Sequence, residues 1–409
     1  MNPDVVRLLN RPFMADPYPA LADLRENHAA VPVENGGFRM WLITRYDDAR
    51  SLLADPGLLV DLVEHRHVVV AQNLLDIERR AKLPRQMRRS VLQQDGAHHR
   101  RLRDLVTGHF TPARLASLRP RIERIATDLL DELPTDEPVD LVARYSRPLA
   151  ATVVSELYGV PEKARRRFPV WEMALLTAPS KSEVEDAALR LLEFAGEMID
   201  RKREQPGDDL FTELVRAHAA GGLDDDELVS MIPLMLNAGM EPASAISSGV
   251  FTLLCHPREL ARLRDDAGLL TACVEEVLRF ETPLRMLVPR LLDHPVELAG
   301  VTVPAGELLL ISAGAANRDP SRYPDPDRFD VGRDTRGHLG FGHGVHRCLG
   351  AELGRLETTI ALGTLFGRFP GADLAVPAED VRWRPGMLMR RLDALPVILR
   401  PAGARREGR

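Results

Sequence analysis

A lone cysteine in a glycine-rich stretch is the residue best suited to chemistry in this sequence. Cys348 lies within residues 341–350, directly before a stretch whose apolar residues recur at helical spacing. The unpaired N–H groups and the dipole at a helix N-terminus favour a thiolate over a thiol. Gly344 and Gly350 leave room for a flat cofactor against the backbone. A thiolate here would suit haem iron, because axial thiolate ligation favours O–O cleavage.

This stretch resembles a known cofactor loop. Its sequence, Phe-Gly-His-Gly-Val-His-Arg-Cys-Leu-Gly, matches the haem-binding loop of the cytochrome P450 superfamily, Phe-x-x-Gly-x-x-x-Cys-x-Gly, at Phe341, Gly344, Cys348 and Gly350. The resemblance extends over nearly the whole chain and is greatest to the soluble bacterial, actinobacterial-like class. It implies a mainly α fold with a small β part, in one domain spanning residues 1–409. Haem b would lie between a long central helix and the helix after the loop, with Cys348 ligating the iron.

Histidine and arginine side chains outside the loop are candidates for holding the two haem propionates. His99 and Arg103 are four residues apart in a segment similar to the family's Asp-Pro-Pro-x-His-Thr-x-x-Arg motif, although both prolines and the threonine are replaced here. Cationic donors on one helix face suit carboxylates. Arg290 and His346 match the family's other propionate contacts. Each alone could equally be a surface charge.

A Glu–Arg pair upstream of the loop resembles the family's buried Glu-Arg-Arg network. Glu276 and Arg279 are three residues apart, so they can pair on one helix face. The resemblance identifies Arg328, in Pro-Asp-Arg-Phe, as the third member of the network. Its role would be to support the haem loop, and a buried charge network needs complete pairing.

The predicted central helix departs from the family pattern where it would cross the oxygen side of the haem. Residues 238–243 resemble Ala/Gly-Gly-x-Asp/Glu-Thr-Thr, with Glu241 as the acid of the proton relay but Pro242 at the alcohol position. A proline inside a helix costs about 3 kcal/mol. We expect protons from substrate, from ordered water, or from Ser244 or Ser247 one turn further on. The alternative is a simple kink in which water replaces the hydroxyl.

Apolar residues at the family's pocket positions are candidates for contact with substrate. They are aliphatic or contain sulfur, which suits a hydrophobic or aromatic substrate without identifying it, and ordinary core packing is the alternative for each. These residues are Met235, Ala238, Leu284, Met286, Leu287, Val288, Met387 and Leu388.

A run of positive charge lies in the segment predicted to form the lid of the substrate pocket, residues 61–94. Residues 79–89 contain six cations and no acid. A solvated surface is one interpretation. The other is an anionic partner at the pocket mouth, either a substrate carboxylate or an acidic carrier protein holding the substrate.

Composition limits the remaining possibilities. The chain has 409 residues, 44% of them hydrophobic, and a net charge of −6, which gives no reason to expect nucleic-acid binding. The three cysteines, an odd and sparse set, favour a reducing compartment. No signal peptide and no run of about 18 apolar residues is evident. We therefore expect a cytoplasmic protein without a membrane partner.

Periodicity predicts mostly helix, with few strands. The expected helices begin near residue 16 and residue 47, cover 100–131 and much of 160–220, and include one long apolar helix from 224 to 256. Residues 38–44 alternate like a strand. Residues 296–303 and 308–312, joined by a Pro-Ala-Gly turn, are predicted to form a β-hairpin.

The resemblance implies a haem-thiolate monooxygenase of secondary metabolism, such as antibiotic biosynthesis. It would hydroxylate, epoxidise or couple a hydrophobic or aromatic natural product, using O₂ and electrons from a ferredoxin and ferredoxin reductase. The ferredoxin would dock on the cysteine face, where Arg347 and Arg355 could meet an acidic partner. One alternative is a peroxide-using or radical-coupling enzyme, since Pro242 would alter oxygen activation. The other is a non-catalytic haem protein that docks on a carrier domain.

Overall fold

The computed structural model describes residues 6–7, 11–35, 38–62, 64–65, 84–177 and 181–401. Helices dominate this part of the chain, as predicted. In order they are α1 (Arg11–Ala15), α2 (Tyr18–Asn27), α3 (Tyr46–Ala54), α5 (Gly96–Thr107), α6 (Pro112–Asp131), α7 (Arg147–Tyr158), α8 (Phe168–Thr177), α9 (Lys181–Glu204), α10 (Leu210–Ala219), α11 (Asp225–Gly239), α12 (Pro242–Cys255), α13 (Pro257–Asp265), α14 (Leu270–Phe280), α15 (Ala313–Ala316) and α16 (Ala351–Arg368).

The strands form three sheets. The largest has the order β1-β2-β3-β9-β6-β4, the second β10-β11-β5 and the third β7-β8. Their bounds are β1 Val6–Arg7, β2 Ala30–Asn35, β3 Phe38–Ile43, β4 Leu58–Leu59, β5 Pro138–Asp140, β6 Arg290–Leu292, β7 Val296–Leu298, β8 Val301–Val303, β9 Leu308–Ile311, β10 Asp373–Leu374 and β11 Pro396–Ile398.

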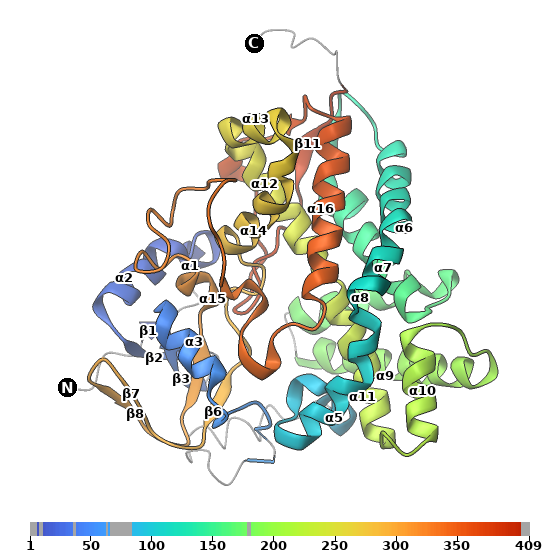
Figure 1. The fold of residues 1–409 in the computed structure, drawn as a ribbon, viewed down its shortest axis with the longest axis vertical. Coiled ribbons are helices and arrows are strands. Elements are labelled where there is room, and N and C mark those ends of the chain that lie inside the picture. Colours follow the sequence, from blue (N-terminus) through green and yellow to red (C-terminus); the bar gives the residue numbers. More distant parts are fainter. Residues whose placement is uncertain are drawn as a thin grey trace.

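The largest sheet and the main helical body lie on different sides of the molecule (Figure 1). One large hydrophobic cluster fills the helical body, and two smaller clusters pack against the two faces of the sheet. Helices α12 and α16 run side by side through the middle, with α6 on the other side of α16 (Figure 1). The predicted cysteine loop therefore leads into a helix at the centre of the fold.

The predicted long helix from 224 to 256 is two helices. It begins as expected, because Asp224 and Glu227 form a capping box in which each carboxylate accepts the other residue's backbone N–H, at 2.7 and 2.9 Å. It breaks between Gly239 and Pro242, and α12 starts with proline in its first turn. A proline there loses no helical hydrogen bond, so the cost of about 3 kcal/mol for an interior proline does not apply.

The predicted hairpin also differs in its strand pairing. Strands β7 and β8 pair with each other, and Ala299 and Gly300 between them have positive φ values of 45° and 84°. A two-residue turn of this kind matches the twist of paired strands. After the Pro-Ala-Gly turn, β9 instead joins β3 and β6 in the large sheet. Its four buried residues suit a strand in the sheet interior.

Candidate functional site: a cysteine loop and a broken central helix

The cysteine loop is held by its own backbone. The N–H of Cys348 donates to the Phe341 carbonyl oxygen at 2.8 Å, and the N–H of Arg347 donates to Gly344 at 3.1 Å. The Arg355 guanidinium lies 4.6 Å from the centre of the Phe341 ring, a cation–π contact from α16. These contacts place Cys348 three residues before α16, as the sequence predicts.

Two glycines are required by the path of this loop. Gly342 and Gly344 have φ values of +68° and +71°, which favour glycine. A Cβ on Gly344 would also lie 2.0 Å from the backbone oxygen of Leu53 in α3. Gly344 therefore permits the loop to pack directly on α3.

The thiol of Cys348 has accessible surface, but the surrounding protein does not favour its ionised form. Burial raises the pKa of this thiol, while the N–H of Gly350 and the arginines nearby, Arg347 first, act in the opposite direction. The N–H of Gly350 thus acts in the direction expected of a helix N-terminus, but in the protein alone burial of the thiol outweighs it. A thiol that coordinates a metal is deprotonated by the metal itself.

The other two cysteines are poor candidates for a thiolate. Burial raises the pKa of Cys255 to about 11 and that of Cys273 to about 12. Both lie in helices, Cys255 at the end of α12 and Cys273 in α14.

The four predicted propionate contacts surround one location beside the loop. The rings of His99 and His346 are 4.2 Å apart, although they belong to α5 and to the cysteine loop. Burial, followed by the charges of His346 and Arg103, lowers the pKa of His99 to about 4. Arg290 on β6 also acts on this pKa. Four side chains from three separate segments, α5, β6 and the cysteine loop, thus form one basic cluster.

Asp95, which the sequence analysis did not single out, anchors this cluster. Its Oδ2 accepts the N–H groups of Val60 and Asp61, each at 2.9 Å, and its Oδ1 lies 3.6 Å from His346 Nε2. Asp95 lies at the N-cap position of α5, where Asp is favoured, and this position is the sequence signal that could have identified it.

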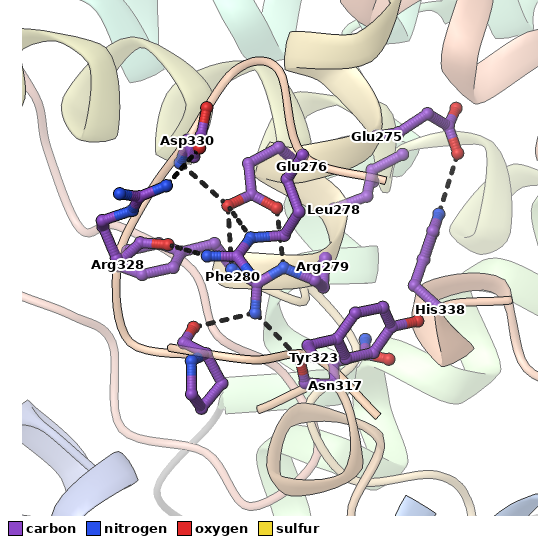
Figure 2. Close-up of polar contacts among 12 residues, drawn as sticks. Glu275, Glu276, Leu278, Arg279, Phe280, Asn317, Tyr323, Arg328, Asp330 and His338 are labelled. Atoms are coloured by element: carbon purple, nitrogen blue, oxygen red, sulfur yellow. Dashed lines mark hydrogen bonds and ion pairs between the residues drawn. The ribbon is translucent and has the colours of Figure 1, made fainter. Parts of the chain in front are cut away.

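The buried network has a different third member from the one predicted. Glu276 and Arg279 are fully buried and form two hydrogen bonds, of 2.6 and 2.8 Å (Figure 2). Arg333 completes the network, because its Nε lies 3.3 Å from Glu276 Oε1. Arg328 is 62% exposed and pairs with Asp325 and Asp330 instead. Arg328 contributes only its carbonyl oxygen, which accepts from Arg333 at 2.9 Å.

The network reaches the cysteine loop through Asn317. Arg279 Nη1 donates to the carbonyl oxygens of Asn317 and Pro326, each at 2.9 Å (Figure 2). The side-chain oxygen of Asn317 accepts the N–H of Leu339, two residues before Phe341, at 2.6 Å. This path gives the network a physical means of supporting the loop.

The helix break presents an acid but no hydroxyl at the next position. Glu241 immediately precedes α12, and its carboxylate accepts from Arg391 Nη2 and, at 3.4 Å, from the Ser244 hydroxyl. Burial raises the pKa of Glu241, whereas Arg391 lowers it. The Ser247 hydroxyl instead donates to the Ala243 carbonyl at 2.8 Å. Of the two serines, Ser244 is the one that contacts the acid.

Comparison with known proteins identifies the family of this arrangement. Residues 177–371 match the family model described as cytochrome P450. The chain is 41% identical to the 6-deoxyerythronolide B hydroxylase of Saccharopolyspora erythraea, over 95% of this chain and 97% of that protein. The chain belongs to the cytochrome P450 family.

Solved P450 structures are similar over almost the whole chain. The tirandamycin C-bound P450 monooxygenase TamI has 38% identity and a TM-score of 0.90, covering 96% of this chain and all of that one. P450BioI, in complex with an acyl carrier protein that carries hexadec-9Z-enoic acid, has 32% identity and a TM-score of 0.85, covering 95% and 99%. This protein is therefore a cytochrome P450 monooxygenase, and its cofactor is thiolate-ligated haem b.

The basic cluster fits the propionates of that cofactor. Three of its nitrogen atoms, His99 Nε2, His346 Nε2 and Arg290 Nε, are buried and have no hydrogen-bond partner among the described residues. Buried polar groups ordinarily have partners. Carboxylates would provide these partners, and an anion would favour protonation of His99. Arg103 donates to the Arg347 carbonyl oxygen at 2.9 Å, which ties α5 to the loop.

The predicted pocket residues divide into two groups. Ala238 is exposed near the end of α11, and Leu284, Val288, Met387 and Leu388 are partly exposed. The remaining three, Met235, Met286 and Leu287, are 6%, 0% and 5% exposed and lie in the hydrophobic clusters. For these three, ordinary core packing is the observed arrangement.

The positive segment is only partly described. Residues 79–83 lie outside the described residues. Arg89 is 23% exposed and pairs with Asp224 at 3.2 Å and Glu227 at 3.8 Å, so it is not a solvated charge. Arg355, expected to face a redox partner, pairs with Glu275 and Glu352, whereas Arg347 is 48% exposed and lies 3.7 Å from Glu352. None of the described helices is long and apolar enough to cross a membrane.

Proposed function

We propose that Cys348 is the axial ligand of haem b in this P450, and that the enzyme oxidises a hydrophobic natural product. The observation that carries the proposal is the cysteine loop beside a basic cluster with three unpartnered buried nitrogen atoms. Bound haem would supply the activation of O₂, which thiolate ligation favours. His99, Arg103, Arg290 and His346 would hold the propionates, and the loop backbone would orient the sulfur.

The substrate class proposed is a polyketide-like or other apolar scaffold. The partly exposed wall is aliphatic and sulfur-containing, with Leu284, Val288, Met387 and Leu388 on it. The names of a relative, 6-deoxyerythronolide B hydroxylase, and of a structural neighbour bound to tirandamycin C support this class. The proposed reaction is hydroxylation or epoxidation. The proposal includes a substrate tethered to a carrier protein, since one structural neighbour binds such a carrier.

Electrons are proposed to come singly from a ferredoxin and its reductase. Arg347, next to Cys348 and 48% exposed, is the cation best placed to meet an acidic partner on this face. Arg355 is less suited, because Glu275 and Glu352 already occupy its guanidinium.

The ligand assignment is tested with Cys348→Ala. We expect this variant to lose the thiolate signature of the reduced carbon monoxide complex and all turnover. Cys255→Ala is the matched control and is expected to keep both. Retention of the thiolate signature by Cys348→Ala would rule out the assignment. A panel of macrolactones, fatty acids and steroids, screened by the haem spin-state shift, would identify the substrate class.

A peroxide-using enzyme is the second candidate, because Pro242 replaces the usual alcohol beside Glu241. The two candidate functions are distinguished by measuring product formation in two reactions. One reaction supplies hydrogen peroxide, and the other supplies a surrogate ferredoxin, its reductase and O₂. The monooxygenase proposal requires coupled turnover with the ferredoxin, and product from peroxide alone would favour the second candidate.

A further inference from the structure

A small polar cavity lies beside the helix break. It is bounded by α7, α8, the first turn of α12 and the segment before β11, and its charged lining residues are Arg147, Glu172, Arg384 and Arg391. The space within it that the centre of a water molecule can occupy is about 20 Å³. About 10–15 Å³ is sufficient for one water molecule. The cavity is therefore large enough for water and too small for a substrate of the proposed class.

Two carboxylates share one arginine in this cavity. Arg391 Nη2 donates to Glu172 Oε1 at 3.2 Å and also to Glu241 Oε1. The Arg391 side chain is 9% exposed and the Glu172 side chain 1%. The three residues come from α8, from the helix break and from the C-terminal segment, so only the fold brings them together.

Three polar atoms of this group have no hydrogen-bond partner in the part of the chain that the structure describes. They are Arg391 Nε, Arg391 Nη1 and Glu172 Oε2, all buried. Arg147 Nη2 lies 3.7 Å from Glu172 Oε2, which is beyond hydrogen-bond distance. Buried water typically makes about three hydrogen bonds to such groups. The donors and acceptors around the cavity match that requirement.

We propose that Glu172, Arg391 and water in this cavity form a proton-supply unit for Glu241. The inference rests on the proposed function and names the source of protons where the alcohol is missing. Glu241 contacts the unit because its carboxylate accepts from Arg391. The exposed residue Ala238 lies before the break, near the end of α11. Arg391 would act as a positioning residue that holds the acid toward the cavity.

Each transfer conserves protons. An O–H bond of a cavity water breaks as an O–H bond forms on the hydroxyl oxygen of Ser244, which lines the cavity, and Ser244 gives its own proton to Glu241. The resulting hydroxide regains a proton from the next water or from solvent. Arg147 lines the cavity, and its side chain is 24% exposed. Ser244, whose hydroxyl is 3.4 Å from Glu241 Oε2, is available to pass the proton along α12.

The charges around Glu241 act on it in opposite directions. Burial first, and then Glu172, raise the pKa of Glu241, whereas Arg391 and the Ser244 hydroxyl lower it. Arg147 and Arg384 are the other charged groups that face this cavity. Removing the charge of Glu172 should therefore ease ionisation of Glu241, and removing the charge of Arg391 should hinder it.

The test uses the holoenzyme and measures the infrared band of the protonated carboxyl group. The Glu241 component is identified as the part of the band that Glu241→Gln removes, and its midpoint is followed with pH. We expect Glu172→Gln to shift this midpoint down and Arg391→Gln to shift it up. Glu197→Gln, in an exposed pair with Arg167, is the matched control and should leave it unchanged. Arg391→Lys replaces Arg391→Gln if the latter does not fold, and should shift the midpoint less.

A second measurement follows where oxygen goes during turnover with a surrogate ferredoxin. General acid–base groups typically contribute at least about a hundredfold, so we expect Glu172→Gln to lower product per O₂ consumed by roughly tenfold or more, with peroxide rising. Unchanged midpoints in Glu172→Gln and Arg391→Gln, or product yields equal to those of Glu197→Gln, would overturn the proton-supply unit. A wild-type enzyme without the thiolate signature would instead overturn the proposed function. The infrared midpoints are measured without turnover, so they test the proton-supply unit separately from the monooxygenase activity.

Discussion

Burial separates two arginines that lie only five residues apart. Arg333 is 10% exposed and contacts the fully buried Glu276, whereas Arg328 is 62% exposed among aspartates on the surface. Arg333 also donates to the carbonyl oxygens of Pro324 and Asp325, so it holds together the segment before the cysteine loop. An arginine therefore has a structural role at position 333 and a minor role at position 328.

Arg333→Ala should lower the free energy of unfolding by about 3–5 kcal/mol, because the buried Glu276 carboxylate loses one of its ionic partners and the carbonyl oxygens of Pro324 and Asp325 lose their donor. Arg328→Ala, the matched control, should lower it by less than about 1 kcal/mol, as is usual for exposed ion pairs. Urea unfolding followed by circular dichroism, together with haem retention, measures both. Equal losses in the two variants would contradict the assignment of Arg333.

A second residue-scale prediction concerns Glu275 in acid. Burial raises its pKa, but hydrogen bonds from His338 and Arg355 outweigh burial and lower the pKa to about 2 from an ordinary value of 4.5. His338 Nδ1 accepts the N–H of Gly340, so Nε2 carries the proton donated to Glu275 at 2.9 Å. The ionised carboxylate thus ties α14 to the start of the cysteine loop.

Because the folded pKa of Glu275 is depressed, its contribution is complete above about pH 4.5 and is lost as the pH falls toward 2. The contribution at neutral pH is at most about 3 kcal/mol. Glu275→Gln should therefore destabilise the enzyme at neutral pH and flatten the acid limb of its stability curve. Unfolding midpoints in urea, measured at several pH values, check this slope, and a parallel curve for the variant would contradict it.

At the scale of elements, the break between α11 and α12 has the strongest functional consequence. The N–H of Glu241 donates to the Ala238 carbonyl at 3.2 Å, so this carbonyl keeps a partner although Pro242 has no N–H. Pro242 occupies a first-turn position that suits proline. The break therefore exposes Ala238 and orients Glu241 without strain from the proline.

Pro242→Ala should change the free energy of unfolding by no more than about 1 kcal/mol, since proline is accommodated in a first turn. Pro242→Thr restores the family alcohol, yet we expect product formation to stay the same or fall, because the proposed proton source is the cavity beside Glu172 and Arg391. Chemical unfolding and product per O₂ consumed test the two statements. A large rise in coupled turnover for Pro242→Thr would mean that the proline is only a defect.

At this scale, a buried arginine also links the segment around Leu284 to the segment around Met387. Arg285 is 1% exposed, and its guanidinium donates to the carbonyl oxygens of Gly386 at 2.5 Å and Met387 at 3.3 Å. Its own carbonyl oxygen accepts the N–H of Gly314 at 3.0 Å. One buried side chain thus holds the segments around Leu284 and Met387 at a set separation.

At the scale of the whole molecule, Glu281 ties together segments from both ends of the chain. Its carboxylate accepts from Arg390 at 2.6 Å and from the hydroxyl of Tyr18 on α2 at 3.2 Å. Arg318 lies 3.7 Å from the same carboxylate and stacks 3.4 Å from the centre of the Tyr18 ring. The N-terminal helices, the end of α14 and the C-terminal segment therefore meet around one buried acid.

Glu281→Gln should cost about 3–5 kcal/mol, because two nearly buried arginines lose their shared counter-charge. Glu123→Gln is the control, since Glu123 forms an exposed pair with Arg119, and it should cost less than about 1 kcal/mol. Thermal unfolding of both variants provides the measurement. A melting temperature for Glu281→Gln equal to that of the control would show that this group does not hold the segments together.

The sequence by itself determined the features that depend on neighbouring residues. The cysteine loop and the cap at Asp224 are local, and their chemistry follows from residue types at close spacing. The helix and strand content was also predictable, because periodicity reports which side of an element is buried. The balance at Cys348 between the N–H of Gly350, which lowers the pKa of the thiol, and burial, which raises it, depends on the tertiary structure.

Only the tertiary structure decided which of several similar side chains meet. Arg333 rather than Arg328 reaches Glu276, and Glu172 and Arg391 reach Glu241, although neither contact follows from sequence spacing. The split of the predicted long helix and the pairing of β9 with β3 were likewise decided by the fold. An ionic partner is chosen by burial and by the path of the backbone, since a desolvated charge must find a counter-charge wherever the fold places one.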